Sequence, residues 1–228
     1  MYQYETHLHT WPESACAHAT VEENLAFYKA LGYDGVFITN HFLDGNINID
    51  HRKPYEERIR FYFSDYEKAL EVGKELDIRV FCGVELSFYG TDFLVYGLDK
   101  QWFLEHPQIM EMERREQLQL MMDSGALVIQ AHPYREAAYI DHIRLFPRHV
   151  HGVEEVNACR TEEENEMARL YRFHYGLLSF AGSDNHIGGN LKNLAGMCCE
   201  TPVRDEQDFI SKVKAGKMEI FTRTNPDR

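Results

Sequence analysis

Short apolar runs alternate along the chain with stretches that have helical periodicity. The apolar runs predict strands at 3–9, 35–41, 79–89, 91–99, 126–134, 151–159, 177–186 and 197–203. The stretches between them predict helices at 20–32, 64–77, 107–123, 162–175 and 205–217. Regular alternation of strands and helices is typical of a parallel sheet with crossover helices. It therefore predicts an α/β fold, either a barrel or a doubly wound sheet.

Three connections between these elements are long or rich in glycine. Residues 42–60 are too long for an ordinary strand-to-helix loop, so we expect them to form a lid or a pocket wall. The segments 134–150 and 187–196 follow later strands, and 188–196 reads as a glycine-rich loop. We expect substrate specificity to lie in these three segments.

Composition limits the class of protein. With 228 residues, of which 44% are hydrophobic, the chain suits one domain over residues 1–228. It has no apolar run long enough to span a membrane and no signal-peptide pattern, which predicts a cytoplasmic protein with no membrane partner. The net charge of −13 argues against nucleic acid as a partner. Five cysteines without CxxC spacing argue against a disulfide framework. The oligomeric state is not predicted.

Ligand-type side chains follow most of the apolar runs, where each predicted strand ends. In a strand, residues two apart point to the same face, and both H-L-H and D-N-H have this spacing. Buried imidazoles and carboxylates need partners, and α/β barrels build active sites at the carboxyl ends of their strands. Nitrogen and oxygen donors of this kind suit divalent metals. We therefore predict seven metal ligands: His7, His9, His41, Glu85, His132, Asp184 and His186.

The stretches HLHT (7–10), ITNH (38–41), GVE (83–85), AHP (131–133) and GSDNH (182–186) occur in an order that resembles the PHP (polymerase and histidinol phosphatase) family of metal-dependent phosphoesterases. The resemblance covers nearly the whole chain. It implies a distorted (β/α)7 TIM-like barrel with two or three divalent ions, zinc, manganese or iron, at the carboxyl ends of the strands. It also implies hydrolysis of phosphate esters and assigns the same seven ligands.

Three positions depart from the pattern of this family. An Asp or His is usual six or seven residues after the H-x-H motif, where this chain has Cys16. The resemblance makes Cys16 the expected ligand there, with His18 and Glu13 as alternatives. Asp92 occupies a place where the family often has histidine, and it is a further expected ligand. Asn40 stands where aspartate is usual, in a role that supports the ligands.

Two residues near the strand ends are candidate catalytic and substrate-binding groups. Arg135 directly follows A-H-P-Y, and its planar guanidinium suits a phosphate. Asn157 ends a predicted strand and is expected to orient substrate or water. Arg160 is a weaker candidate for phosphate, and alternation leaves open whether Glu154 or Glu155 points inward.

These features predict a hydrolase that acts on a small phosphorylated metabolite, either a histidinol-phosphatase-like enzyme or a nucleotide phosphatase, through metal-activated water. One alternative is a non-catalytic metal-binding or regulatory domain of the same family. Another is an amidohydrolase-type metalloenzyme that cleaves C–N bonds. Amidohydrolases usually use a lysine on a strand or two further histidines, and no lysine ends a predicted strand here, which favours the phosphoesterase.

Overall fold

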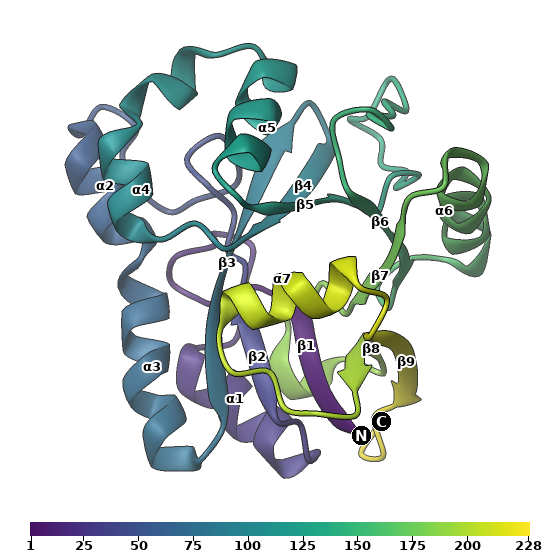
Figure 1. The fold of residues 1–228 in the computed structure, drawn as a ribbon. Helices are drawn as coiled ribbons and strands as arrows, with labels where there is room; N and C mark the ends of the chain where they lie inside the picture. Colours follow the sequence, from purple (N-terminus) through teal and green to yellow (C-terminus); the bar gives the residue numbers. More distant parts are fainter.

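A computed structural model describes all 228 residues, and its nine strands form one curved mixed sheet (Figure 1). In chain order the strands are β1 (Tyr2–Leu8), β2 (Gly35–Ile38), β3 (Arg79–Phe88), β4 (Thr91–Tyr96), β5 (Leu127–Ala131), β6 (Gly152–Asn157), β7 (Leu178–Gly182), β8 (Asn193–Cys199) and β9 (Glu219–Thr224). Their order in the sheet is β7-β6-β5-β4-β3-β2-β1-β8-β9. The chain just beyond β7 returns to the end of β1, where Leu8 and Asn185 form a bridge. The sheet is therefore a nearly closed barrel.

Six strands of the barrel run in the same direction. β1, β2 and β3 pair in parallel, as do β5, β6 and β7, and β4 runs antiparallel between β3 and β5. The carboxyl ends of all six therefore lie on one rim, and the amino end of β4 lies on the same rim. The predicted α/β barrel is confirmed. A wholly parallel sheet is wrong, because β4, β8 and β9 pair antiparallel.

Most of the helices lie outside the barrel. They are α1 (Val21–Ala30), α2 (Tyr55–Tyr62), α3 (Ser64–Leu76), α4 (Lys100–Glu105), α5 (Arg114–Asp123), α6 (Glu162–Tyr175) and α7 (Glu206–Lys214). α1 and α3 pack together beside β2 and β3, and α6 covers β6 (Figure 1). α1 begins with a capping box, in which Thr20 and Glu23 each accept from the other's backbone N–H, as their spacing suggests.

Aromatic side chains fill the barrel below the rim. Phe37 stacks on Phe81 with ring centroids 4.8 Å apart, and Tyr96 meets Phe37 edge to face. Phe209 of α7 packs on Phe37 at 4.3 Å. The segment before α7 is tied to the amino end of β3, where Arg79 donates to the carbonyl of Val203 at 2.6 Å. α7 therefore closes the barrel at the end opposite the rim.

Several regions differ from the elements predicted, and α2 and α4 were not predicted at all. The helix expected at 107–123 is a 3-10 turn at Pro107–Glu111 followed by α5, because Met112 and Glu113 have extended backbone. The strand expected at 197–203 is β8, which starts inside the predicted glycine-rich loop, and β9 was not predicted. β8 begins early because its residues pair with both β1 and β9. Gly196 fits this position because a Cβ there would overlap the carbonyl of Tyr4.

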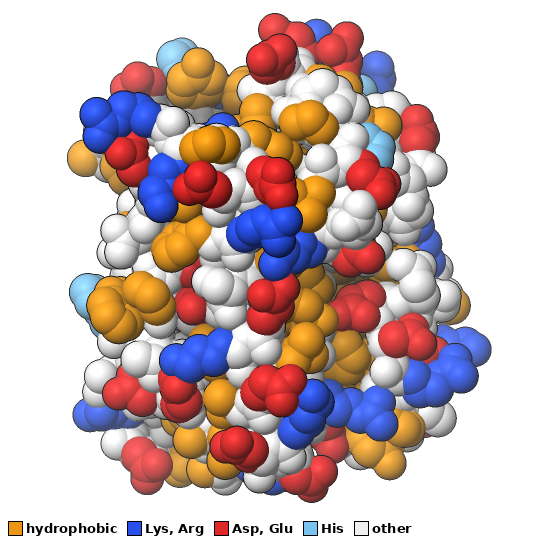
Figure 2. Space-filling view, turned by 90° about the vertical axis from the view of Figure 1, so that its left-hand side faces the viewer, with side chains coloured by type: hydrophobic (Ala, Val, Ile, Leu, Met, Phe, Trp, Pro, Cys, Tyr) orange, Lys and Arg blue, Asp and Glu red, His pale blue; other side chains and the backbone are white.

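The surface shows the mixed charge expected of a globular protein. On the face shown in Figure 2, Lys and Arg side chains are interspersed with Asp and Glu, without a continuous basic area. Pairs such as Lys68 with Glu22 and Lys100 with Glu67, both at 2.7 Å, link neighbouring helices.

None of the helices has the length and apolar character that crossing a membrane would require.

Candidate metal centre

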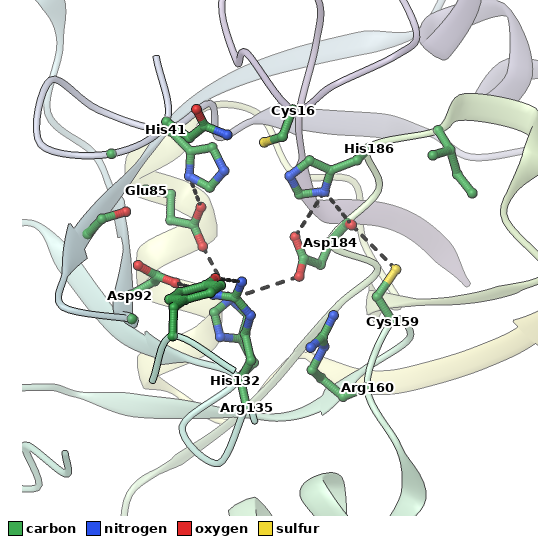
Figure 3. A pocket seen from close by; sticks show the side chains of 16 residues that line it. Cys16, His41, Glu85, Asp92, His132, Arg135, Cys159, Arg160, Asp184 and His186 are labelled. Carbon is green, nitrogen blue, oxygen red and sulfur yellow. Dashed lines mark hydrogen bonds and ion pairs between the residues drawn. The ribbon is translucent and has the colours of Figure 1, made fainter. Parts of the chain in front are cut away.

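The seven predicted ligands converge at the rim of the barrel around Glu85 of β3, and Figure 3 labels His41, Glu85, His132, Asp184 and His186 among them. Glu85 Oε1 lies 3.1 Å from His7 Nε2 and 3.4 Å from His132 Nε2. Its other oxygen, Oε2, lies 2.7 Å from His41 Nδ1 and 3.4 Å from His9 Nε2. The carboxylate therefore lies between two pairs of imidazoles, and each of its oxygens faces one pair.

Three groups of ligand atoms are close enough to hold a cation each. Within each group the candidate ligand atoms lie within 4.8 Å of one another. The groups are His7, Glu85 and His132; His7, His9 and Asp184; and His9, His41 and His186. The predicted convergence of these side chains is therefore present in the structure. Neither Cys16 nor Asp92 belongs to these groups.

Buried polar atoms at the centre lack the hydrogen bonds that burial demands. They are His7 Nε2, His9 Nε2, His41 Nδ1 and both carboxylate oxygens of Glu85. An unpaired buried polar atom is costly, so such a cluster calls for another partner. Imidazole nitrogens and carboxylate oxygens directed at one another are the donors that divalent metals bind. The residues present therefore fit the metal ions that the PHP resemblance implies.

Burial and neighbouring charges have opposite effects on the pKa values of Glu85 and His7. Burial opposes ionisation of Glu85, yet the neighbouring His7 and His41 hold its pKa well below the usual value. Burial likewise opposes a charge on His7, but Glu154, Asp184 and Glu85 hold its pKa well above the usual value. Groups of opposite charge around Glu85 and around His7 thus act against the effect of burial on each pKa.

Glu154 and Asn157 of β6 support the ligands from behind. His7 Nδ1 donates to Glu154 Oε1 at 2.9 Å, which leaves Nε2 facing Glu85. The other oxygen of Glu154 accepts from the His132 backbone N–H at 3.0 Å and from Asn157 Nδ2 at 2.9 Å. Asn157 also donates to Asp184 at 3.4 Å and is fully buried behind the cavity. We therefore correct its expected role from a substrate contact to a residue that positions carboxylates.

Glu5, which the sequence reasoning missed, ties the two ends of the barrel closure together. One carboxylate oxygen accepts from the backbone N–H of Thr6, His7 and Ser183, at 2.9–3.0 Å. The other accepts from Tyr28 of α1 at 2.8 Å. Burial raises the pKa of Glu5 to about 7 despite these donors. The Glu5 side chain therefore holds both the start of the H-L-H segment and Ser183, the residue before Asp184.

Of the three candidates for the position after H-L-H, Cys16 is the one that lines the cavity. Burial would raise the pKa of its thiol, but contacts with His186 and His41 lower it to about 6. His18 is exposed, and Glu13 is buried away from the cavity. The geometry favours Cys16, and its role as a ligand stays a prediction.

Glu13 belongs instead to a buried polar network around Asn40. Asn40 Nδ2 donates to Glu13 and to Thr10 Oγ1, while its Oδ1 accepts from the Thr10 N–H and from Ser14 Oγ. Ser14 Oγ also lies 3.2 Å from His9 Nδ1. Because the Ser14 hydroxyl donates to Asn40 Oδ1, its oxygen accepts from His9 Nδ1–H, and this tautomer leaves His9 Nε2 free for a metal. The network therefore orients His9.

The metal centre opens into a cavity of about 480 Å³. Asp92 enters it from the start of β4, with Oδ2 3.8 Å from His132 Nε2 and 3.4 Å from Arg135 Nη1. Arg135 also contacts Tyr139. Gly45 of the segment 42–60 lines the cavity as well. Arg135 thus lines the cavity beside Asp92, and its role toward a phosphate stays a prediction, while part of the segment 42–60 forms a pocket wall.

Two of the candidate ligands have strained backbone. His132 has a φ of 25° and Asp184 a φ of 56°, in the left-handed region that residues with a side chain rarely adopt. His132 directly follows β5, and Asp184 lies just beyond the end of β7. Strain of this kind persists where the surroundings require one side-chain direction, as they do here.

The fold and the site define a class of protein, an α/β barrel with a candidate polynuclear metal centre at the strand ends. Residues 162–218 match the family model PHP_C, described as PHP-associated. A two-domain protein from Bacteroides vulgatus that contains a predicted PHP-like metal-dependent phosphoesterase has a similar structure, with a TM-score of 0.68 and 14% identity. The match covers 96% of this chain and 64% of that protein. The family match supports the PHP resemblance over residues 162–218, and the structural likeness shows a shared fold.

Two further structures have the same fold. A protein from Bifidobacterium adolescentis, assigned as a metal-dependent phosphoesterase, matches with a TM-score of 0.54 and 13% identity, over 82% of this chain and 88% of its own. An amidohydrolase from Chromobacterium violaceum, with bound sulfate and no metal, matches with a TM-score of 0.57 and 13% identity, over 95% and 97%. At such identities the likeness shows the fold alone, so it does not favour C–N cleavage here. No curated protein sequence matches the chain.

Proposed function

We propose that this protein is a metal-dependent phosphoesterase that hydrolyses a phosphate ester of a small metabolite. One observation carries the proposal. Buried imidazole and carboxylate atoms without hydrogen-bond partners converge at the floor of a cavity that Arg135 also lines. The first feature suits divalent metals and the second suits a phosphate, and a phosphoesterase needs both.

Two or three divalent ions, zinc, manganese or iron, would be held by the three groups of ligand atoms. Glu85 would offer one oxygen to the imidazoles on each of its sides, and Cys16 and Asp92, which line the same cavity, are proposed as further ligands. Such ions supply activation of water and neutralisation of charge on the phosphate oxygens.

The residues of the chain bind the phosphate and keep the ligands in place. The guanidinium of Arg135 presents N–H donors to the phosphate oxygens, and its ion pair with Asp92 fixes its direction. Glu154 accepts a hydrogen bond from His7 Nδ1–H, which keeps the proton on Nδ1 and leaves His7 Nε2 free for a metal. Asn157 holds the carboxylate of Asp184 toward the cavity. The contacts of Arg135 with Asp92, of Glu154 with His7 and of Asn157 with Asp184 are present in the structure.

Metal content and phosphate release test the proposal. Protein purified without chelator should contain at least two ions per chain, and fewer than about 1.5 would refute a polynuclear centre. The protein, with zinc, manganese or iron restored, is then screened for phosphate release from phosphomonoesters. Full metal content without release from any ester would favour the non-catalytic alternative.

A paired variant locates the activity in this site. His7→Ala combined with Glu85→Ala removes ligand atoms from two of the three groups. It should abolish both metal binding and phosphate release. His174→Ala is the matched control, because His174 is an exposed histidine on α6, away from the rim. If the paired variant retained activity, the assignment of the site would be wrong.

A further inference from the structure

Arg160 is a cation of the cavity that has no counter-ion in the protein. It lies in the loop between β6 and α6, and its side chain lines the same cavity as Arg135 (Figure 3). It makes no ion pair and donates no side-chain hydrogen bond, and its Nε is buried without a partner. Arg135, by contrast, is paired with Asp92. The two arginines therefore differ in what they have left to bind.

Glu164, whose carboxylate lies close enough to Arg160 to be affected by its charge, is already engaged elsewhere. Glu164 accepts from the backbone N–H of Thr161 and of Glu136, both at 2.8 Å, in the cap of α6. Its carboxylate is thereby fixed at the helix start, so Arg160 influences its pKa without pairing with it. An arginine whose donors are partly desolvated and unpaired gains most from an anionic ligand.

The cavity has room for more than one phosphate group. Its volume of about 480 Å³ lies within the range of pockets that hold whole small molecules. Tyr139 and Ile187 also line the cavity and add apolar surface to its wall. Arg135 and Arg160 come from the loops after β5 and β6, which are neighbouring strands. A ligand seated at the metal centre therefore has a second cation within the same cavity.

Resting on the proposed phosphoesterase function, we propose that Arg160 binds a second anionic group of the substrate. The substrate class is then a phosphate ester that carries a further phosphate or carboxylate on the part that leaves. Ions at the metal centre and Arg135 engage the phosphate that is hydrolysed, while Arg160 selects for the second charge.

Matched pairs of esters test this selection. Fructose 1,6-bisphosphate is compared with fructose 6-phosphate, and 3-phosphoglycerate with glycerol 3-phosphate. The wild type should have the higher kcat/KM for the compound with two anionic groups in at least one pair. The pair that shows the preference tells whether the second group is a phosphate or a carboxylate. In R160Q that preference should fall roughly 10- to 100-fold, as expected for loss of a hydrogen bond between charged groups. R160K should restore part of it.

Two controls make the result specific. R115Q removes an exposed arginine of α5 that pairs with nothing, and it should keep the preference of the wild type. Metal content is measured in every variant, because R160Q should retain the ions. If the wild type shows no preference, or if R160Q lowers kcat/KM equally for both members of every pair, the role of Arg160 is refuted while the phosphoesterase function stands.

A binding measurement separates this proposal from the proposed function. Calorimetric titration of the metal-loaded protein with the same four compounds reports affinity whether or not turnover occurs. Absence of turnover would refute the phosphoesterase. The difference in affinity between paired compounds, and its loss in R160Q, would still decide the role of Arg160.

Discussion

Replacing Asn40 with aspartate should destabilise the protein, because it places a second carboxylate against Glu13. Asn40 and Glu13 are each 1% exposed, and the Asn40 amide makes four hydrogen bonds. Two of these bonds are donated by Nδ2, to Glu13 and to Thr10 Oγ1. Aspartate has no such donor, so an oxygen would face an oxygen. Asp65, which accepts from Thr10 Oγ1 at 2.7 Å, adds a further negative charge nearby.

The size of the effect follows from burial. Leaving a buried charge without its partner costs about 3–5 kcal/mol. For a protein of this length, each kcal/mol lowers Tm by about 2–4 °C. Asn40→Asp should therefore lower Tm by roughly 6–20 °C near neutral pH.

The effect should depend on pH in a defined direction. Burial, and then Asp65, already hold the pKa of Glu13 well above its usual value, and a second carboxylate would raise the pKa of the pair further. A carboxyl group with a raised pKa holds its proton more tightly in the folded state than in the unfolded chain. The destabilisation should thus be small below the unfolded pKa, about pH 4, and should grow as the pH rises toward the pKa of the pair.

A double-mutant cycle tests the reasoning. Asn40→Asp, Glu13→Gln and the double variant are unfolded thermally and in urea at several pH values. The double variant exchanges amide and carboxylate, so it should recover most of the lost stability, with a coupling free energy of about 2 kcal/mol or more. The reasoning fails if Asn40→Asp is as stable as the wild type at pH 8. It fails equally if Glu13→Gln does not rescue it.

Three further predictions concern the support of the metal centre. Glu154→Gln should weaken metal binding about 10- to 100-fold, measured by competition with a chromophoric chelator, because one amide oxygen replaces the two carboxylate oxygens that accept from His7, His132 and Asn157; unchanged affinity would contradict this role. Glu5→Ala should lower both Tm and metal content, because three backbone N–H groups and the Tyr28 hydroxyl lose their acceptor; Glu5→Gln, which keeps one acceptor, should lose less. Removal of metal by chelation should lower Tm, by the equivalent of about 2.7 kcal/mol if the ions were present at 100 times their Kd, and restored metal should reverse the change; a Tm indifferent to metal would argue against ions in the buried site.

The predicted ligands come together because their prediction rests on local chemistry and a general rule of topology. His41 and Glu85 end apolar runs, where a charged or polar side chain requires a reason. The carboxyl ends of parallel strands meet at one rim whatever the detailed strand order. Because β4 runs antiparallel to β3 and β5, its amino end, and not its carboxyl end, lies at this rim. The rim therefore stays intact although the sheet is not wholly parallel. Asp92 thus reaches the site by a route that the predicted topology did not contain.

The supporting residues were harder to predict because their direction depends on register. A bulge interrupts the pairing of β6 with β7 between Glu154 and Val156. Regular alternation therefore does not decide which glutamate points inward. In the structure Glu154 faces His7, while Glu155 pairs with Arg172 and accepts from Ser179. Glu5 was missed for a related reason, since its partners come from segments some 180 residues apart along the chain.

The departures from the PHP pattern bear on whether the site is functional. In a decaying site, substituted residues would be expected to leave their neighbours unpaired. Here Asn40 makes every hydrogen bond that its amide can make, and Glu13 supplies a carboxylate beside the position where the family usually has one. Cys16 lies between two histidines with its pKa lowered, and Asp92 is paired with Arg135. Each substitution is matched by a neighbour that fits it, which favours a retained metal site over a degenerate one.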